Sequence, residues 1–249
     1  GRSQADLRTL AIVDWALDDP AAFQAHCEGL AVSGDASPLH VQWRLAPARV
    51  TDPRQPRSRE ATLENLGPEW TWVDPYGDCS HVIDGALVIR AANRRDLSDW
   101  NVSAPRLVRA VEGDFVAQVT CSAALPDRPY IGGILAWVAP TDFLRLDVGT
   151  AGCDEVTFLG SVAGETREVG RGRLPTDRTF LRMESMDGRV RALCSEDGVD
   201  WFSVGDTDFA APSAVQVGVH AIGAIDRVVY PGAHVDGTAI RFDDFRLWA

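Results

Sequence analysis

The stretch Phe143-Leu144-Arg145-Leu146-Asp147-Val148 decides the fold of this chain. Apolar and polar side chains alternate along it, and successive side chains of a β-strand point to opposite faces of a sheet. Its three aliphatic side chains are therefore expected to face a core, with Phe143, Arg145 and Asp147 on the other face. The stretch predicts a strand with one face in the interior of a β-protein.

Other runs with the same period lie on both sides of this strand. Asp84-Gly85 and Asp187-Gly188 each separate two alternating runs, and Asp-Gly in that position is typical of a β-hairpin. Val217 and Val219 are expected to share the interior with Leu144 and Leu146. Further strands are predicted over residues 81–83, 86–91, 115–123, 130–138, 155–162, 180–186, 189–195, 201–204, 215–222 and 239–248. Strands this short and this closely spaced predict an all-β fold, an antiparallel jelly-roll β-sandwich.

The first 65 residues have a different residue pattern from the rest of the chain. Asp18-Asp19-Pro20 is typical of a helix start, which predicts a helix over residues 21–30. Residues 49–60 carry prolines and many charges and are typical of a linker. We therefore expect a short, partly helical N-terminal segment with a linker over residues 1–65 and the sandwich over residues 66–249.

Composition restricts the partners and the compartment. The chain has 249 residues and a formal net charge of −12, which disfavours nucleic acid and anionic membranes as partners. It has no apolar run near the roughly 18 residues of a membrane helix. The five cysteines are widely spaced, which favours a reducing, cytoplasmic location, with Cys121 and Cys194 expected to pack as buried thiols. The start Gly1-Arg2-Ser3 lacks a methionine, and we expect the chain to be part of a larger protein.

An ordered series of short motifs runs through the sandwich region. It comprises Trp70-Thr71-Trp72, Asp84-Gly85-Ala86-Leu87-Val88-Ile89, Ala104-Pro105-Arg106-Leu107, Gly113-Asp114-Phe115, Gly132-Gly133-Ile134-Leu135, Phe143-Leu144-Arg145-Leu146, Leu181-Arg182-Met183, Ser195-Glu196-Asp197-Gly198-Val199-Asp200-Trp201 and Phe242-Asp243-Asp244-Phe245. Over about residues 68–249 this series resembles the concanavalin A-like lectin/glucanase superfamily, and within it a bacterial branch of domains of unknown function. The resemblance implies two curved antiparallel sheets whose concave face binds glycans in the better-known relatives.

The resemblance also implies a structural calcium ion on the convex side. Asp243 or Asp244 of the last strand would bind it together with an early turn at Gly77-Asp78. The alternative is that these carboxylates cap a turn or pair with Arg241 or Arg246. No other cofactor is expected.

The glucanases of this superfamily carry Glu-x-Asp-x-x-Glu on one strand, because glycoside hydrolysis needs two carboxylates about 5 Å apart. The sequence lacks this motif. Glu165 and Glu168 would lie on opposite faces of a strand, and Asp154 and Glu155 diverge because they are adjacent. No catalytic residue is therefore predicted, and glucanase activity is disfavoured.

One candidate binding surface follows the polar face of residues 143–148. Trp137, Arg182, Glu184 and His220 are expected to join Phe143, Arg145 and Asp147 from neighbouring strands. An aromatic ring flanked by arginine and carboxylates can stack on a sugar and hydrogen-bond it. The alternative is an ordinary solvated sheet face with cross-strand ion pairs.

A second candidate is the loop over residues 221–238, which carries Asp226, Arg227 and Tyr230, with Trp100 and Asn101 at the same rim. Long ordered loops on rigid sandwiches often line binding sites. The alternative is a purely structural loop.

These observations favour a non-catalytic recognition module for a glycan or another polar ligand, within a larger bacterial protein. Two alternatives stay open. One is a glycan-active hydrolase or lyase whose carboxylates the sequence does not pair. The other is an intracellular interaction or regulatory domain that contacts another protein or upstream domains of its own chain.

Overall fold

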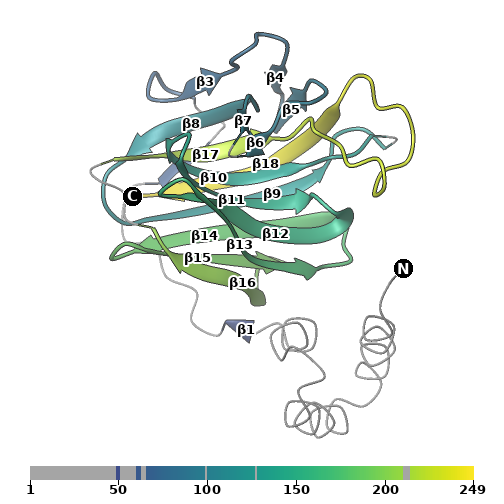
Figure 1. Ribbon diagram of the computed structural model, residues 1–249. Helices are drawn as coiled ribbons and strands as arrows, with labels where there is room; N and C mark the ends of the chain where they lie inside the picture. The colour runs from purple at the N-terminus through teal and green to yellow at the C-terminus, as the bar shows by residue number, and fades with distance from the viewer. Residues whose placement is uncertain (1–48, 51–59, 63–65, 99, 127, 210–213) are drawn as a thin grey trace, which may run out of the picture. The chain divides into compact units, whose positions relative to one another are not determined.

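The computed structural model describes residues 49–50, 60–62, 66–98, 100–126, 128–209 and 214–249 (Figure 1). Within these residues all regular secondary structure is β, and no helix is long and apolar enough to cross a membrane. The chain divides into Gly1–Arg49 and Val50–Ala249, and the second unit forms the sandwich. The helix expected over residues 21–30 lies outside the described residues.

A nine-stranded sheet forms one layer of the sandwich. Its order is β1-β16-β15-β14-β9-β18-β5-β4, and β2 also pairs with β18. The bounds are β1 Arg49–Val50, β2 Glu60–Thr62, β4 Ser80–Ile83, β5 Leu87–Ala91, β9 Phe115–Ala123, β14 Arg178–Met186, β15 Arg189–Ser195, β16 Trp201–Asp208 and β18 Thr238–Trp248. Because β2 pairs with β18, the sandwich includes residues upstream of the boundary expected at residue 66.

A seven-stranded sheet forms the second layer, in the order β13-β12-β11-β10-β17-β8-β3. Its bounds are β3 Thr71–Val73, β8 Arg106–Val111, β10 Gly132–Ala139, β11 Asp142–Gly149, β12 Gly152–Val162, β13 Glu165–Arg173 and β17 Val215–Ala221. A separate two-stranded hairpin joins β6 (Leu97–Ser98) to β7 (Asn101–Val102). Neighbouring strands from β2 to β18 pair antiparallel, which confirms the predicted antiparallel sandwich.

Both Asp-Gly hairpins form as predicted. In the first, Ile83 of β4 pairs with Leu87 of β5. In the second, Met186 of β14 pairs with Arg189 of β15, and Asp187 and Gly188 both have positive φ angles of 51° and 76°. Two consecutive positive φ angles are those of a type I′ turn, whose twist matches that of the flanking strands. The turn therefore fixes the register of β14 and β15.

The main hydrophobic core lies between the two sheets. Leu144 and Leu146 from β11, and Val217 and Val219 from β17, are fully buried in it, as the alternation predicts. The nine-stranded sheet contributes Leu181 and Met183 among others. Cys121 and Cys194 are also buried in this cluster, as expected of thiols that pack as small hydrophobic groups.

Replacing Leu146 by alanine tests the assignment of the core. The side chain is fully buried, so Leu146→Ala should lower the free energy of unfolding by about 2–5 kcal/mol, through lost burial and the cavity left behind. Equilibrium unfolding in urea measures this change. Val228→Ala is the control, because Val228 is 91% exposed and its removal should change stability by less than about 0.5 kcal/mol. Equal stability of both variants would contradict the core.

Candidate functional site

The polar face of β11 carries the first candidate surface. Phe143, Arg145 and Asp147 point away from the main core, as predicted. Trp137 of β10 is in register with Phe143, and their rings stack with centroids 5.3 Å apart. The guanidinium carbon of Arg106 lies 4.3 Å from the centre of the Trp137 ring. The aromatic part of the expected row therefore assembles on one face of the seven-stranded sheet.

This face is covered, so it is neither the open ligand platform nor the solvated surface that the sequence suggested. Asp147 and His220 have no exposed surface, and Trp137 is only 7% exposed. The covering segments are the β6–β7 hairpin and the loop that follows β17 (Figure 1). Together they form a second hydrophobic cluster on the outer face, made of Leu97, Ala104, Val108, Ile131, Leu135, Trp137, Phe143 and Ile222, with Val102, Ala224, Ile225 and Tyr230 against it.

Under this cover lies a group of buried charged side chains. His220 Nε2 lies 2.9 Å from Asp147 Oδ1, and Arg145 Nε lies 3.3 Å from Asp147 Oδ2. Arg145 also reaches Asp96, at 3.4 Å, immediately before β6. Burial alone would raise the pKa of Asp147, but the charges of Arg145 and His220 outweigh it and hold this pKa below its usual value. Asp147 is therefore a structural anion with its partners inside the protein.

Gly133 lies on the strand between Asp147 and His220. Asp147 is on β11 and His220 on β17, with β10 between them, so their backbones are about 10 Å apart. Gly133 of β10 is in register with both residues and places no side chain between them. A larger residue at this position would have no room, because a Cβ would lie 1.9 Å from the carbonyl oxygen of Leu146.

Arg182 and Glu184 do not join this group. They belong to β14 in the nine-stranded sheet, where Leu181 and Met183 alternate with them and face the main core. Arg182 Nε donates to Glu184 Oε1 at 2.7 Å, and Arg191 donates to the other carboxylate oxygen, also at 2.7 Å. The sequence could not assign these two strands to different sheets, because alternation specifies a face and not a partner strand.

The residues expected at the rim have mixed roles. Trp100 is 81% exposed between β6 and β7. The Asn101 side chain donates to the carbonyl of Arg94 and accepts from Ser103, so it stabilises the hairpin. In the loop after β17, Asp226 accepts from the Val228 amide and Arg227 is exposed, while Tyr230 donates its hydroxyl to the carbonyl of Gly149 at 2.7 Å.

The structure does not group Asp78 with Asp243 or Asp244, the residues proposed for calcium. Asp243 accepts from the guanidinium of Arg241 at 2.8 Å, which is the alternative stated above. Asp78 forms a two-point contact with Arg95, whose hydrogen bond lowers the pKa of this carboxyl. Among the described residues, the side chains close enough to share an ion are those of Asp74, Asp78 and Cys79, and Asp243 and Asp244 are not among them.

A cavity with a volume of about 1220 Å³ lies at one end of the sandwich. We call it the rim cavity. It lies where β9 ends, β12 begins and the β13–β14 connection crosses from one sheet to the other, beside the loop after β17. Its lining consists of Ser122, Ala123, Pro126, Arg128, Pro129, Tyr130, Cys153, Asp154, Pro175, Thr176, Asp177, Val229, Tyr230, Pro231 and His234.

Tyrosines and charged groups converge on the rim cavity. Tyr130 donates its hydroxyl to the carbonyl of Cys153 at 3.2 Å, and burial is the main cause that raises its pKa to about 12. Arg128 pairs with Asp236 at 2.7 Å and thereby ties the loop before β10 to the loop after β17. Of the predicted site residues, Tyr230 alone lines this cavity. The sequence does contain a signal for this cavity. Prolines at 126, 129, 175 and 231 stiffen the connections at this end of the sandwich.

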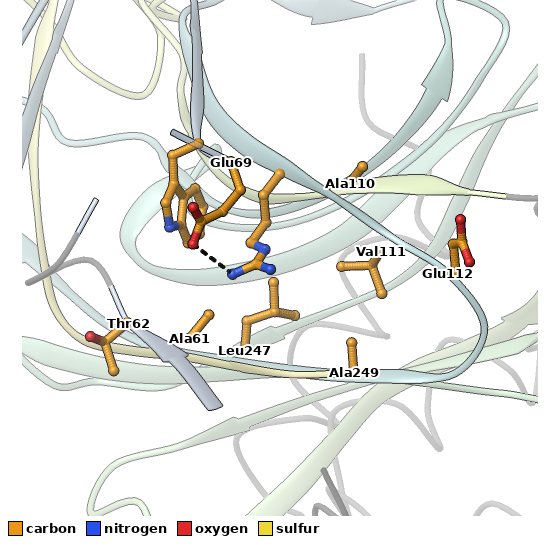
Figure 2. A pocket seen from close by; sticks show the side chains of 10 residues that line it. Ala61, Thr62, Glu69, Ala110, Val111, Glu112, Leu247 and Ala249 are labelled. Atoms are coloured by element: carbon orange, nitrogen blue, oxygen red, sulfur yellow. Dashed lines mark hydrogen bonds and ion pairs between the residues drawn. The ribbon is translucent and has the colours of Figure 1, made fainter. Parts of the chain in front are cut away.

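A smaller pocket of about 550 Å³ lies where β2, β8 and the end of β18 meet (Figure 2). Figure 2 shows Glu69 and Glu112 on opposite sides of it. Arg109, the one cation among its lining residues, pairs with Glu69 at 3.5 Å. Trp70 packs edge-on against Phe245 of the main core, with ring centroids 5.6 Å apart. Because its one aromatic ring packs against the core, this pocket is the weaker candidate for a binding site.

Comparison with protein-family models and with curated protein sequences finds no match. Solved structures do match. A functionally unknown protein from Saccharomyces cerevisiae aligns with a TM-score of 0.58 and 16% identity, over 73% of this chain and 96% of that one. The GH43 protein BlXynB from Bacillus licheniformis aligns with a TM-score of 0.59 and 18% identity, over 74% of this chain and 37% of that one.

A β-glucanase from Bacillus licheniformis aligns with a TM-score of 0.52 and 11% identity, over 77% of this chain and 98% of that one. At these identities the likeness concerns the fold. The chain is thus a jelly-roll β-sandwich, and in BlXynB the matching part is little more than a third of the protein.

Asp147→Asn tests the buried charged group. The variant removes the anion that faces Arg145 and His220, so the free energy of unfolding should fall by about 3–5 kcal/mol near neutral pH. The pKa of Asp147 is lower in the folded protein than in the unfolded chain. The extra stability of the wild type over the variant is therefore complete above the unfolded pKa of about 3.9. It declines as the pH falls through this value towards the folded pKa. Equilibrium unfolding between about pH 7 and about pH 3 measures both effects.

The matched control is Asp208→Asn, which removes the same charge at an exposed position. It should change stability by less than about 0.5 kcal/mol. An Asp147→Asn protein as stable as the wild type at neutral pH, or a stability difference that grows on acidification, would contradict the assignment.

Proposed function

We propose that this chain is a non-catalytic binding module for a glycan or another polar ligand, and that the rim cavity is its binding site. The observation that carries this proposal is the convergence of two tyrosines, an arginine, a histidine and two aspartates on one large cavity. Aromatic rings supply apolar contact area, and charged side chains supply strong hydrogen bonds to hydroxyl groups. Its volume exceeds the roughly 300–1,000 Å³ of small-molecule pockets, so an oligosaccharide has room.

Two further observations support a binding role. The named structural neighbours include a β-glucanase and a GH43 protein, and this chain matches 37% of the latter. A sandwich that forms part of a larger bacterial glycan-active protein is therefore our proposed context, as a member of the concanavalin A-like superfamily. The covered outer face of the seven-stranded sheet supports a site at the rim, because that face is filled by the chain's own hydrophobic cluster.

A glycan-active enzyme is the second candidate, because Asp154 and Asp177 line the same cavity. Glycoside hydrolysis uses two carboxylates that flank the scissile bond. Incubating bound oligosaccharides with the protein and separating the products by chromatography distinguishes the two functions. If the wild-type protein cleaves the oligosaccharides and Asp154→Asn and Asp177→Asn do not, the chain is a hydrolase and not a non-catalytic binding module.

Glycan-array binding followed by titration calorimetry tests the binding module. Tyr230→Ala should weaken binding of the best array ligand about two- to tenfold, because one aromatic contact contributes about 0.5–1.5 kcal/mol. Tyr76→Ala is the matched control, since Tyr76 is 67% exposed outside the cavity, and its affinity should stay within about twofold. Thermal unfolding of both variants verifies the fold. Binding that survives Tyr230→Ala, or an array without a bound ligand, would reject the proposal.

A further inference from the structure

The rim cavity has an uneven charge balance. Its lining carries Arg128 against Asp154 and Asp177. Arg128 is already neutralised by Asp236 at 2.7 Å. Asp154 pairs with Arg173 at 3.6 Å, and solvent screens both of these partly exposed pairs. Within the part of the chain that the structure describes, no cation lies within ion-pair distance of Asp177. The lining therefore keeps one carboxylate, that of Asp177, without an ion-pair partner.

The tyrosines respond to this negative charge. Burial is the first cause that raises the pKa of Tyr130, and the nearby charges of Asp177 and Asp154 contribute in the same direction. The pKa of Tyr230 is also raised, first by burial and then by neighbours that include Asp154. Both phenols thus stay neutral in a cavity whose field opposes an additional anion.

Several hydrogen-bond donors of the lining are already engaged. Tyr130 donates its hydroxyl hydrogen to Cys153, and Tyr230 donates its own to Gly149. One nitrogen of the Arg128 guanidinium donates to Asp236. The carboxylates of Asp154 and Asp177 only accept hydrogen bonds. A ligand with many hydroxyl or ammonium donors therefore matches these two carboxylates, whereas a carboxylate ligand brings a charge that they repel.

From the charge balance and the donor inventory, we infer that the rim cavity selects neutral or basic saccharides and rejects uronic acids. This inference rests on the proposed function, because it names the ligand class of the same site. Asp177 is the specificity-determining residue. Its carboxylate accepts from sugar hydroxyls or from the ammonium of an amino sugar, and it repels the carboxylate of a uronic acid.

Matched oligosaccharide triads test this inference. Each triad contains a hexose, the corresponding hexuronic acid and the corresponding 2-amino-2-deoxyhexose of equal length, in the gluco, galacto and manno configurations. At low salt we expect the uronic acid of a binding triad to bind about five- to tenfold more weakly than its neutral counterpart, and the amino sugar at least as tightly. Added salt should reduce the difference.

Asp177→Asn keeps the size of the side chain and removes its charge. It should raise the ratio of uronic-acid affinity to neutral-hexose affinity about threefold or more. Asp154→Asn should act in the same direction. Asp208→Asn lowers the net negative charge equally but lies outside the cavity, so it should leave the discrimination unchanged. Thermal unfolding establishes that each variant is folded.

The outcomes separate this inference from the proposed function. If no member of any triad and no array glycan binds, the proposed function fails. If glycans bind at the rim cavity but uronic acids bind as tightly as neutral sugars, the proposed function stands and the inference is overturned. It is also overturned if Asp177→Asn and Asp208→Asn change the discrimination to the same extent.

Discussion

Strand β11 is buried on both faces, so every polar group that it carries must find its partner inside the protein. Leu144 and Leu146 pack into the main core, and Phe143 packs into the outer hydrophobic cluster. Arg145 and Asp147 lie under that cluster with almost no exposed surface. Burying an unpaired charge is costly, and the surrounding structure meets this constraint with ion pairs to His220 and Asp96.

The same constraint links the sheet to the segments that cover it. Arg145 bridges Asp147 in the sheet and Asp96 next to the covering hairpin. The amides of Gly223 and Ala224 donate to the carbonyl of Arg95, which joins the loop after β17 to the segment before β6. Polar contacts therefore position the cover, and Leu97 and Ile222 supply its apolar contacts. With this face closed, the binding site that we propose is the rim cavity, at the ends of the strands.

The sequence predicted much of the fold because strand geometry is local. Period-two alternation placed Leu144, Leu146, Val217 and Val219 correctly in the interior, and Asp187-Gly188 fixed a hairpin through its backbone conformation. What covers the polar face could not be predicted, because it depends on how distant segments pack against it. The rim cavity was missed for a related reason. Its residues come from several connections whose ends meet only after both sheets have formed.

This chain shares its strand arrangement with solved structures from which most of its side chains differ. The sandwich aligns with a β-glucanase over most of both chains at 11% identity, so the arrangement of strands is retained while nearly all side chains differ. A site depends on those side chains and not on the strand order. The carboxylate that this chain places on the outer face of β11 is an anion held by Arg145 and His220, with no exposed surface and no access for a substrate. Such a group cannot deliver a proton to a substrate, and the binding site that we propose lies instead at the ends of the strands.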